Sequence, residues 1–106
     1  MKTYNKLVRD NIPKIIETEG LNPQIRILSD KEYEIELRKK LVEEANELYT
    51  ATSIQEKLYE LADVYEVLEF ILKTNKITEK DILKIKLNKK NNNGSFEKRV
   101  FLKEVN

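Results

Sequence analysis

The sequence has 106 residues, the size of one small domain. Its 20 basic and 19 acidic residues give a net charge of +1, which provides neither the basic footprint of a nucleic-acid-binding protein nor a polybasic membrane patch. Cysteine and histidine are absent, which excludes disulfides, thiolate zinc sites and catalysis by imidazole. For metal binding only oxygen ligands remain, and these select Mg²⁺, Mn²⁺ or Ca²⁺.

No apolar stretch approaches the length of about 18 residues that a membrane-spanning helix needs, and the N-terminal residues lack the apolar region of a signal peptide. We therefore expect a cytoplasmic protein that does not bind membranes. No linker or internal repeat divides the sequence, so residues 1–106 are predicted to form a single domain. A helical bundle built from one copy of this length would be thin, which makes a second copy a plausible partner.

The first half of the chain predicts a short helix and a long one. Asp10 or Asn11 can cap a helix over residues 12–19, with Pro13 in its first turn and Gly20 as its stop. Residues 24–28 alternate enough for a short strand or an extended link. A capping box at residues 29–32 then begins a long helix over residues 30–49.

The second half predicts two more helices. Residues 50–52 break the first long helix, and a second capping box at residues 53–56 begins another over residues 54–74. This helix is apolar around most of its circumference, so we expect it to be the central and most buried element. A lysine-rich helix is predicted over residues 79–89, a loop over residues 91–95, and an extended tail that can form a strand over residues 96–102.

Two pairs of acidic residues occur on the two long helices. Glu44 and Glu47 are three residues apart, as are Glu60 and Asp63, and this spacing places each pair on one side of its helix. At 100° per residue, Glu44 and Glu60 fall inside the apolar stripes and the other two acids lie at the stripe edges. Two carboxylates about 4 Å apart repel by about 4 kcal/mol at an effective dielectric near 20. A divalent cation would remove that penalty, so the pattern predicts a metal site where the helices fold back on each other.

Two other interpretations of these acids remain open. Most glutamates in such a highly charged chain are simply solvated. Alternatively, the protein is a purely structural helical dimer or interaction module, in which the acids form salt bridges with Lys39, Lys40 and Lys57.

Three motifs resemble one protein family. Glu43-Glu44-Ala45-Asn46-Glu47 matches EExxE, and Glu60-Leu61-Ala62-Asp63 matches the ExxD that follows it in MazG-like nucleotide pyrophosphohydrolases, members of the all-α nucleoside-triphosphate pyrophosphatase superfamily. The opening YNKLVRDNIP and the closing GSFEKRVFL resemble the ends of a small single-domain branch described as phosphoribosyl-ATP pyrophosphohydrolase-like. One departure is Asn11, where that branch usually has lysine; Lys14 could supply the missing contact.

The resemblance implies an all-α, MazG-like helical bundle that is completed by homo-oligomerisation as a dimer or tetramer, with short extended N- and C-terminal segments. It implies Mg²⁺ as the cofactor, with Mn²⁺ as a substitute. The implied metal ligands are Glu44, Glu47, Glu60 and Asp63.

The implied reaction is hydrolysis of a nucleoside triphosphate, or of a phosphoribosyl-ATP-like nucleotide, between the α- and β-phosphates. Its products are the monophosphate and pyrophosphate, which suits a role in cleaning the nucleotide pool. Without histidine, an acidic residue is the expected proton acceptor, and Glu43 and Glu44 are the candidates. The expected phosphate-binding cations lie in the two terminal motifs: Lys6, Arg9, Lys98 and Arg99. A nucleotide sensor that keeps the fold without rapid hydrolysis is a further alternative.

Overall fold

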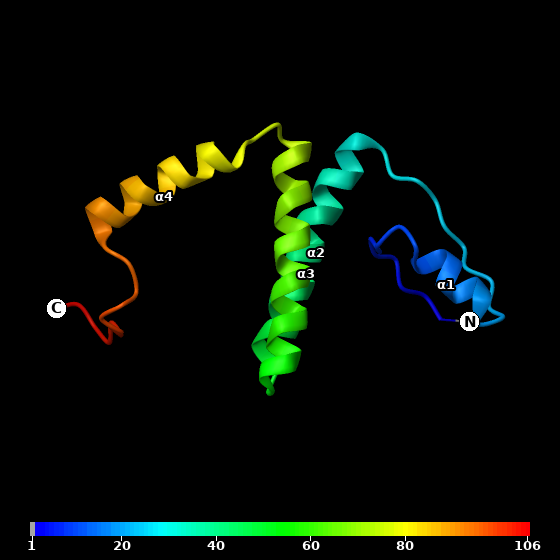
Figure 1. Cartoon of the computed structure of the whole chain (residues 1–106), viewed down its shortest axis with the longest axis horizontal. Coiled ribbons are helices and arrows are strands. Elements are labelled where there is room, and N and C mark those ends of the chain that lie inside the picture. Colours follow the sequence, from blue (N-terminus) through cyan, green and yellow to red (C-terminus); the bar gives the residue numbers. More distant parts are fainter. Residues whose placement is uncertain (1) are drawn as a thin grey trace. The chain divides into compact units, whose positions relative to one another are not determined.

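The computed structural model describes residues 2–106, and these residues form four α-helices and no strand (Figure 1). The helices are α1 (Ile12–Thr18), α2 (Asp30–Thr50), α3 (Ile54–Thr74) and α4 (Glu79–Asn93). The predicted all-α class is therefore confirmed. Contacts divide the chain into one compact unit that ends at Asn75 and a second that begins at Lys76. The single domain over residues 1–106 stays a prediction.

Polar side chains cap the first turns of α2, α3 and α4, whereas Asn11, which was expected to cap α1, makes no side-chain capping hydrogen bond. At α2, Ser29 Oγ accepts a hydrogen bond from the Glu32 amide at 3.3 Å, and the Glu32 carboxylate accepts one from the Ser29 amide at 3.2 Å. This complete capping box satisfies amide groups that have no partner within the helix. At α3 the box is half formed, because the Glu56 carboxylate accepts from the Thr52 amide instead.

The expectation that a loop begins at residue 91 was wrong. The asparagines at residues 91–93 belong to the last turn of α4, which ends at Gly94 with a φ of 81°. The small helix penalty of asparagine does not end a helix early when the next residue is a glycine that adopts the left-handed conformation easily. Residues 24–28 and 96–102 form no strand, because a strand needs a neighbouring strand for its backbone hydrogen bonds, so the link predicted as the alternative remains for residues 24–28.

Helices α2 and α3 form an antiparallel hairpin, joined by residues 51–53 (Figure 1). The buried residues of the hairpin are Leu37 and Glu44 from α2 and Val67 from α3, which are 4%, 8% and 8% exposed. The expectation that α3 is the most buried element was wrong for the single chain. A helix that packs against one neighbour can bury only one side, whatever the composition of its other sides.

The side of α3 away from this contact remains apolar and exposed. Its residues recur at spacings of four and three, which places them on one stripe of the helix. Each is at least 40% exposed: Ile54, Leu58, Leu61, Tyr65 and Leu68. The hairpin therefore leaves uncovered a surface with the pattern of a helix–helix interface. None of the described helices has the length and apolar character needed to cross a bilayer.

Candidate functional site

Three carboxylates from the two helices of the hairpin face one another. Glu44 of α2 and Glu60 and Asp63 of α3 each offer one oxygen, and these oxygens all lie within 4.8 Å of one another. Glu60 and Asp63 are three residues apart on α3, so both point to the side that faces α2. The hairpin thus brings together three of the four acids that the sequence singled out.

Glu44 is the buried member of this group, as its place in the apolar stripe predicted. Burial raises the pKa of Glu44, and the nearby negative charge of Asp63 raises it further. Lys40 opposes this shift, with its Nζ atom 3.6 Å from Glu44 Oε1. The charge on Glu44 is therefore only partly neutralised by the protein.

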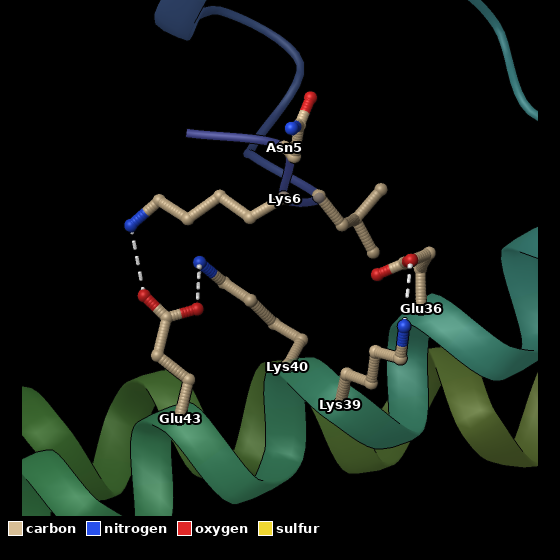
Figure 2. Close-up of a pocket in the computed structure, with 7 residues that line it drawn as sticks. Asn5, Lys6, Glu36, Lys39, Lys40 and Glu43 are labelled. Atoms are coloured by element: carbon tan, nitrogen blue, oxygen red, sulfur yellow. Dashed lines mark hydrogen bonds and ion pairs between the residues drawn. The ribbon is translucent and has the colours of Figure 1, made fainter. Parts of the chain in front are cut away.

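Glu43 lies beside this group and is held by two lysines (Figure 2). Lys6 Nζ donates to Glu43 Oε1 at 2.8 Å, and Lys40 Nζ donates to Oε2 at 3.1 Å. The hydrogen bond from Lys6 is the main cause of a lowered pKa at Glu43. A carboxylate with a lowered pKa is a weaker base, so Glu43 is the weaker base of the two predicted proton acceptors in the metal-free chain.

The space around Glu43 is a small pocket between the N-terminal segment and α2 (Figure 2). Its volume is about 100 Å³, and its lining includes Lys6, Lys39, Lys40 and Glu43. Sites for small organic ligands usually have volumes of about 300–1,000 Å³. This pocket is therefore too small to enclose a nucleotide.

Arg9, in the segment before α1, contacts one of the three converging acids. Its Nη2 atom donates to Asp63 Oδ1 at 2.7 Å, and its Nη1 atom lies 3.9 Å from Glu66 Oε2. The hydrogen bond to Asp63 raises the pKa of Arg9. The sequence singled out Arg9 as a phosphate ligand, and it contained no signal that an acid 54 residues away would be its partner in the structure.

The other predicted residues are exposed. Glu47 is exposed on α2 one turn beyond Glu44 and is not among the three converging acids in the described chain. Lys98 and Arg99 are exposed in the unit that begins at Lys76, and the Arg99 amide closes a turn by donating to Phe96 O at 3.2 Å. Lys14 is exposed on α1. The roles assigned to these four residues stay predictions.

The three converging acids fit a hard divalent cation. Mg²⁺ is bound by oxygen at about 2.0–2.1 Å, so opposite ligands of an octahedral site are about 4.2 Å apart. Neighbouring ligands of such a site are about 3 Å apart, so these oxygens, which lie within 4.8 Å of one another, would have to move closer together to bind one ion. Three protein ligands also leave positions for water and phosphate oxygens, which Mg²⁺ commonly retains. The donor set is thus suited to Mg²⁺ or Mn²⁺.

Comparisons with known proteins add no activity to this description. No family model and no solved structure matches the chain. An uncharacterised protein from Mycolicibacterium smegmatis is 52% identical over 46 residues, which are 43% of this chain and 47% of that protein. The match thus spans about half the length of this relative, so the functional argument rests on the site itself.

Proposed function

We propose that the protein is a Mg²⁺-dependent, MazG-like nucleoside triphosphate pyrophosphohydrolase. The observation that supports this proposal is the convergence of Glu44, Glu60 and Asp63 within 4.8 Å, with Glu44 only 8% exposed. The same acids occupy the two motifs that resemble the family. The substrate is a nucleoside triphosphate or a phosphoribosyl-ATP-like nucleotide, and cleavage between the α- and β-phosphates releases pyrophosphate.

The chain supplies the ligands, the proton acceptor and the phosphate-binding cations of this reaction. Glu44, Glu60 and Asp63 hold the cation, and Glu47 completes the proposed ligand set. When bound, Mg²⁺ supplies charge neutralisation at the phosphates and lowers the pKa of a coordinated water. Glu43 and Glu44 are the candidate proton acceptors, and Glu43 is the one that lies outside the three converging acids.

The phosphate-binding cations of the proposal come from both terminal motifs. Lys6 and Arg9 already lie at the acids, where they pair with Glu43 and Asp63. Lys98 and Arg99 are exposed and free to contact a ligand. Phosphoryl chemistry depends mainly on positioning and on neutralising charge, which these side chains can provide without covalent catalysis.

A homo-oligomer is part of the proposal. The exposed apolar stripe of α3, from Ile54 to Leu68, has the spacing of residues that pack between helices. Covering this stripe with a second hairpin would give a bundle of the predicted kind. Dimer and tetramer both satisfy this argument.

A non-catalytic helical assembly, acting as a nucleotide sensor or an interaction module, is the second candidate. It is favoured by one observation, namely that Asp63, Glu43 and Glu44 all have basic partners within the chain. These ion pairs make the acids tolerable without a metal, although Lys40 neutralises Glu44 only in part. The two candidates differ in whether a divalent cation and turnover are required.

The deciding experiment measures pyrophosphate release from a panel of nucleotides, with Mg²⁺ and with EDTA, alongside melting curves. An enzyme releases pyrophosphate only with Mg²⁺. A sensor shows a melting shift on adding Mg²⁺ and nucleotide but no turnover. A structural module shows neither, and that result would overturn the proposal.

A further inference from the structure

Two cations of the N-terminal segment occupy the edge of the acid group. In the sequence, Lys6 lies 37 residues before its partner Glu43, and Arg9 lies 54 residues before its partner Asp63. Their ion pairs are short, at 2.8 and 2.7 Å, although both basic side chains remain largely exposed. The segment therefore places two positive charges next to the acids.

The attachment of this segment is made by side chains. Among residues 2–106, no backbone hydrogen bond joins the segment before α1 to α2 or α3. Leu7 and Val8, between the two cations, are partly buried. The side-chain pairs of Lys6 with Glu43 and of Arg9 with Asp63 can therefore break without the loss of a backbone hydrogen bond to the hairpin.

The pairing of Arg9 with Asp63 conflicts with metal binding at the same acid. A guanidinium group at 2.7 Å from Asp63 Oδ1 would stand beside a divalent cation that the same carboxylate coordinates. The positive charges of the guanidinium group and the cation would repel each other. Arg9 can move away because its side chain is partly exposed. Lys6 is bonded to Glu43, which is outside the three converging acids, so its pair faces no such direct competition.

We infer that Arg9 is a displaceable internal counter-ion, which pairs with Asp63 in the metal-free chain and is released when a divalent cation binds. Its guanidinium then becomes available to the phosphates of a nucleotide, for which a planar fork of donors is well suited. Metal binding thereby prepares the site for the anionic ligand. The cation therefore binds before the nucleotide or together with it. This inference rests on the proposed metal site.

The test is the affinity of the full chain for Mn²⁺ or Mg²⁺ alone, measured by calorimetry without nucleotide. Breaking an exposed ion pair corresponds to a change of about two- to fivefold in an equilibrium constant. Arg9→Gln should therefore bind the metal about two- to fivefold more tightly than the parent, and it should bind a non-hydrolysable nucleotide with the metal more weakly. Circular dichroism confirms that the variant is folded.

Two control variants separate displacement from a general loss of charge. Arg26→Gln breaks the pair of Arg26 with Glu32, which lies outside the acid group, and its metal affinity should equal that of the parent. Lys6→Gln removes a charge near the same acids without touching Asp63, so its gain should be smaller than that of Arg9→Gln. An equal gain in both segment variants would overturn the specific role of Arg9.

The direction in which Arg9→Gln changes the affinity for the metal also tests the opposite role for Arg9. If Arg9 instead orients Asp63 as a ligand from behind, its removal weakens metal binding, by about 10- to 100-fold in comparable sites. A weaker or unchanged affinity overturns the inference and leaves the metal site standing. A parent chain that binds no divalent cation overturns the proposed function as well.

Discussion

Replacing Glu44 by glutamine in the metal-free protein should raise its stability. Glu44 is 8% exposed and shares its surroundings with two other carboxylates, while the uncharged amide of glutamine has nearly the same shape. A buried charged residue in a folded protein is normally stabilised by its partners, and its loss then destabilises the fold. The metal site predicts the reverse, because Lys40 and Arg9 neutralise this group of acids only in part.

The magnitude follows from the charges around Glu44. At an effective dielectric near 20, unit charges 4.8 Å apart repel by about 3.5 kcal/mol, and both Glu60 and Asp63 lie within that distance. Lys40 at 3.6 Å contributes about 4.6 kcal/mol of attraction. About 2 kcal/mol of repulsion remains, and the Arg9–Asp63 pair together with solvent screening reduces it to about 1 kcal/mol.

A gain of about 1 kcal/mol in the free energy of unfolding raises the Tm of a domain of this size by about 4–8 °C. The assay is thermal unfolding in EDTA, followed by circular dichroism at one fixed protein concentration. With Mg²⁺ the order should reverse, since the parent gains from binding the cation and Glu44→Gln gains less.

Glu43→Gln is the matched control for this prediction. It neutralises the neighbouring acid, but it removes the hydrogen bonds from Lys6 and Lys40, so it should leave the metal-free Tm unchanged or lower it. A clear fall in the metal-free Tm of Glu44→Gln would refute the reasoning. It would identify the Lys40–Glu44 ion pair as a structural contact and favour the non-catalytic candidate.

Three further predictions concern the ligands, the pH dependence and the assembly. Asp63→Asn and Glu47→Gln should each abolish Mg²⁺-dependent pyrophosphate release while circular dichroism stays unchanged; normal turnover in either variant removes that residue from the ligand set. The hydrogen bond from Arg26 lowers the pKa of Glu32 from 4.5 to about 2, so this acid contributes stability above pH 4.5 that is lost as the pH falls toward 2. Acid unfolding of Glu32→Gln should therefore depend less on pH in that window, and an unchanged dependence contradicts the pairing. Leu68→Lys places a charge in the exposed stripe of α3 and should convert the oligomer to a monomer in sedimentation experiments, whereas a parent that is itself monomeric refutes the predicted assembly.

The helices could be predicted from the sequence because their signals are local. Ser29 and Glu32 lie three residues apart, and the capping box that they form depends only on that spacing and on the adjacent backbone. The apolar period of α2 likewise placed Glu44 on its buried side. The end of α4 was predicted too early, because the asparagines were given more weight than the glycine that follows them.

The burial of α3 could not be predicted, because it depends on how many helices surround it. Composition indicates that several sides of α3 are apolar, but only the packing shows that a single α2 covers one of them. In the sequence, the exposed stripe that remains is a series of apolar residues spaced alternately four and three residues apart. The sequence alone does not show that this stripe is uncovered.

The helices, and the side of each helix on which the acids lie, follow from interactions within a few residues and can be predicted from the sequence. Which charges meet depends on how the hairpin and the terminal segment pack. The tertiary structure brought Asp63 to Arg9 and left Glu47 outside the group of three acids, because such contacts depend on how two helices and a terminal segment pack in space. Spacing along the chain fixes the direction of a side chain on its own helix, and the fold supplies its partner.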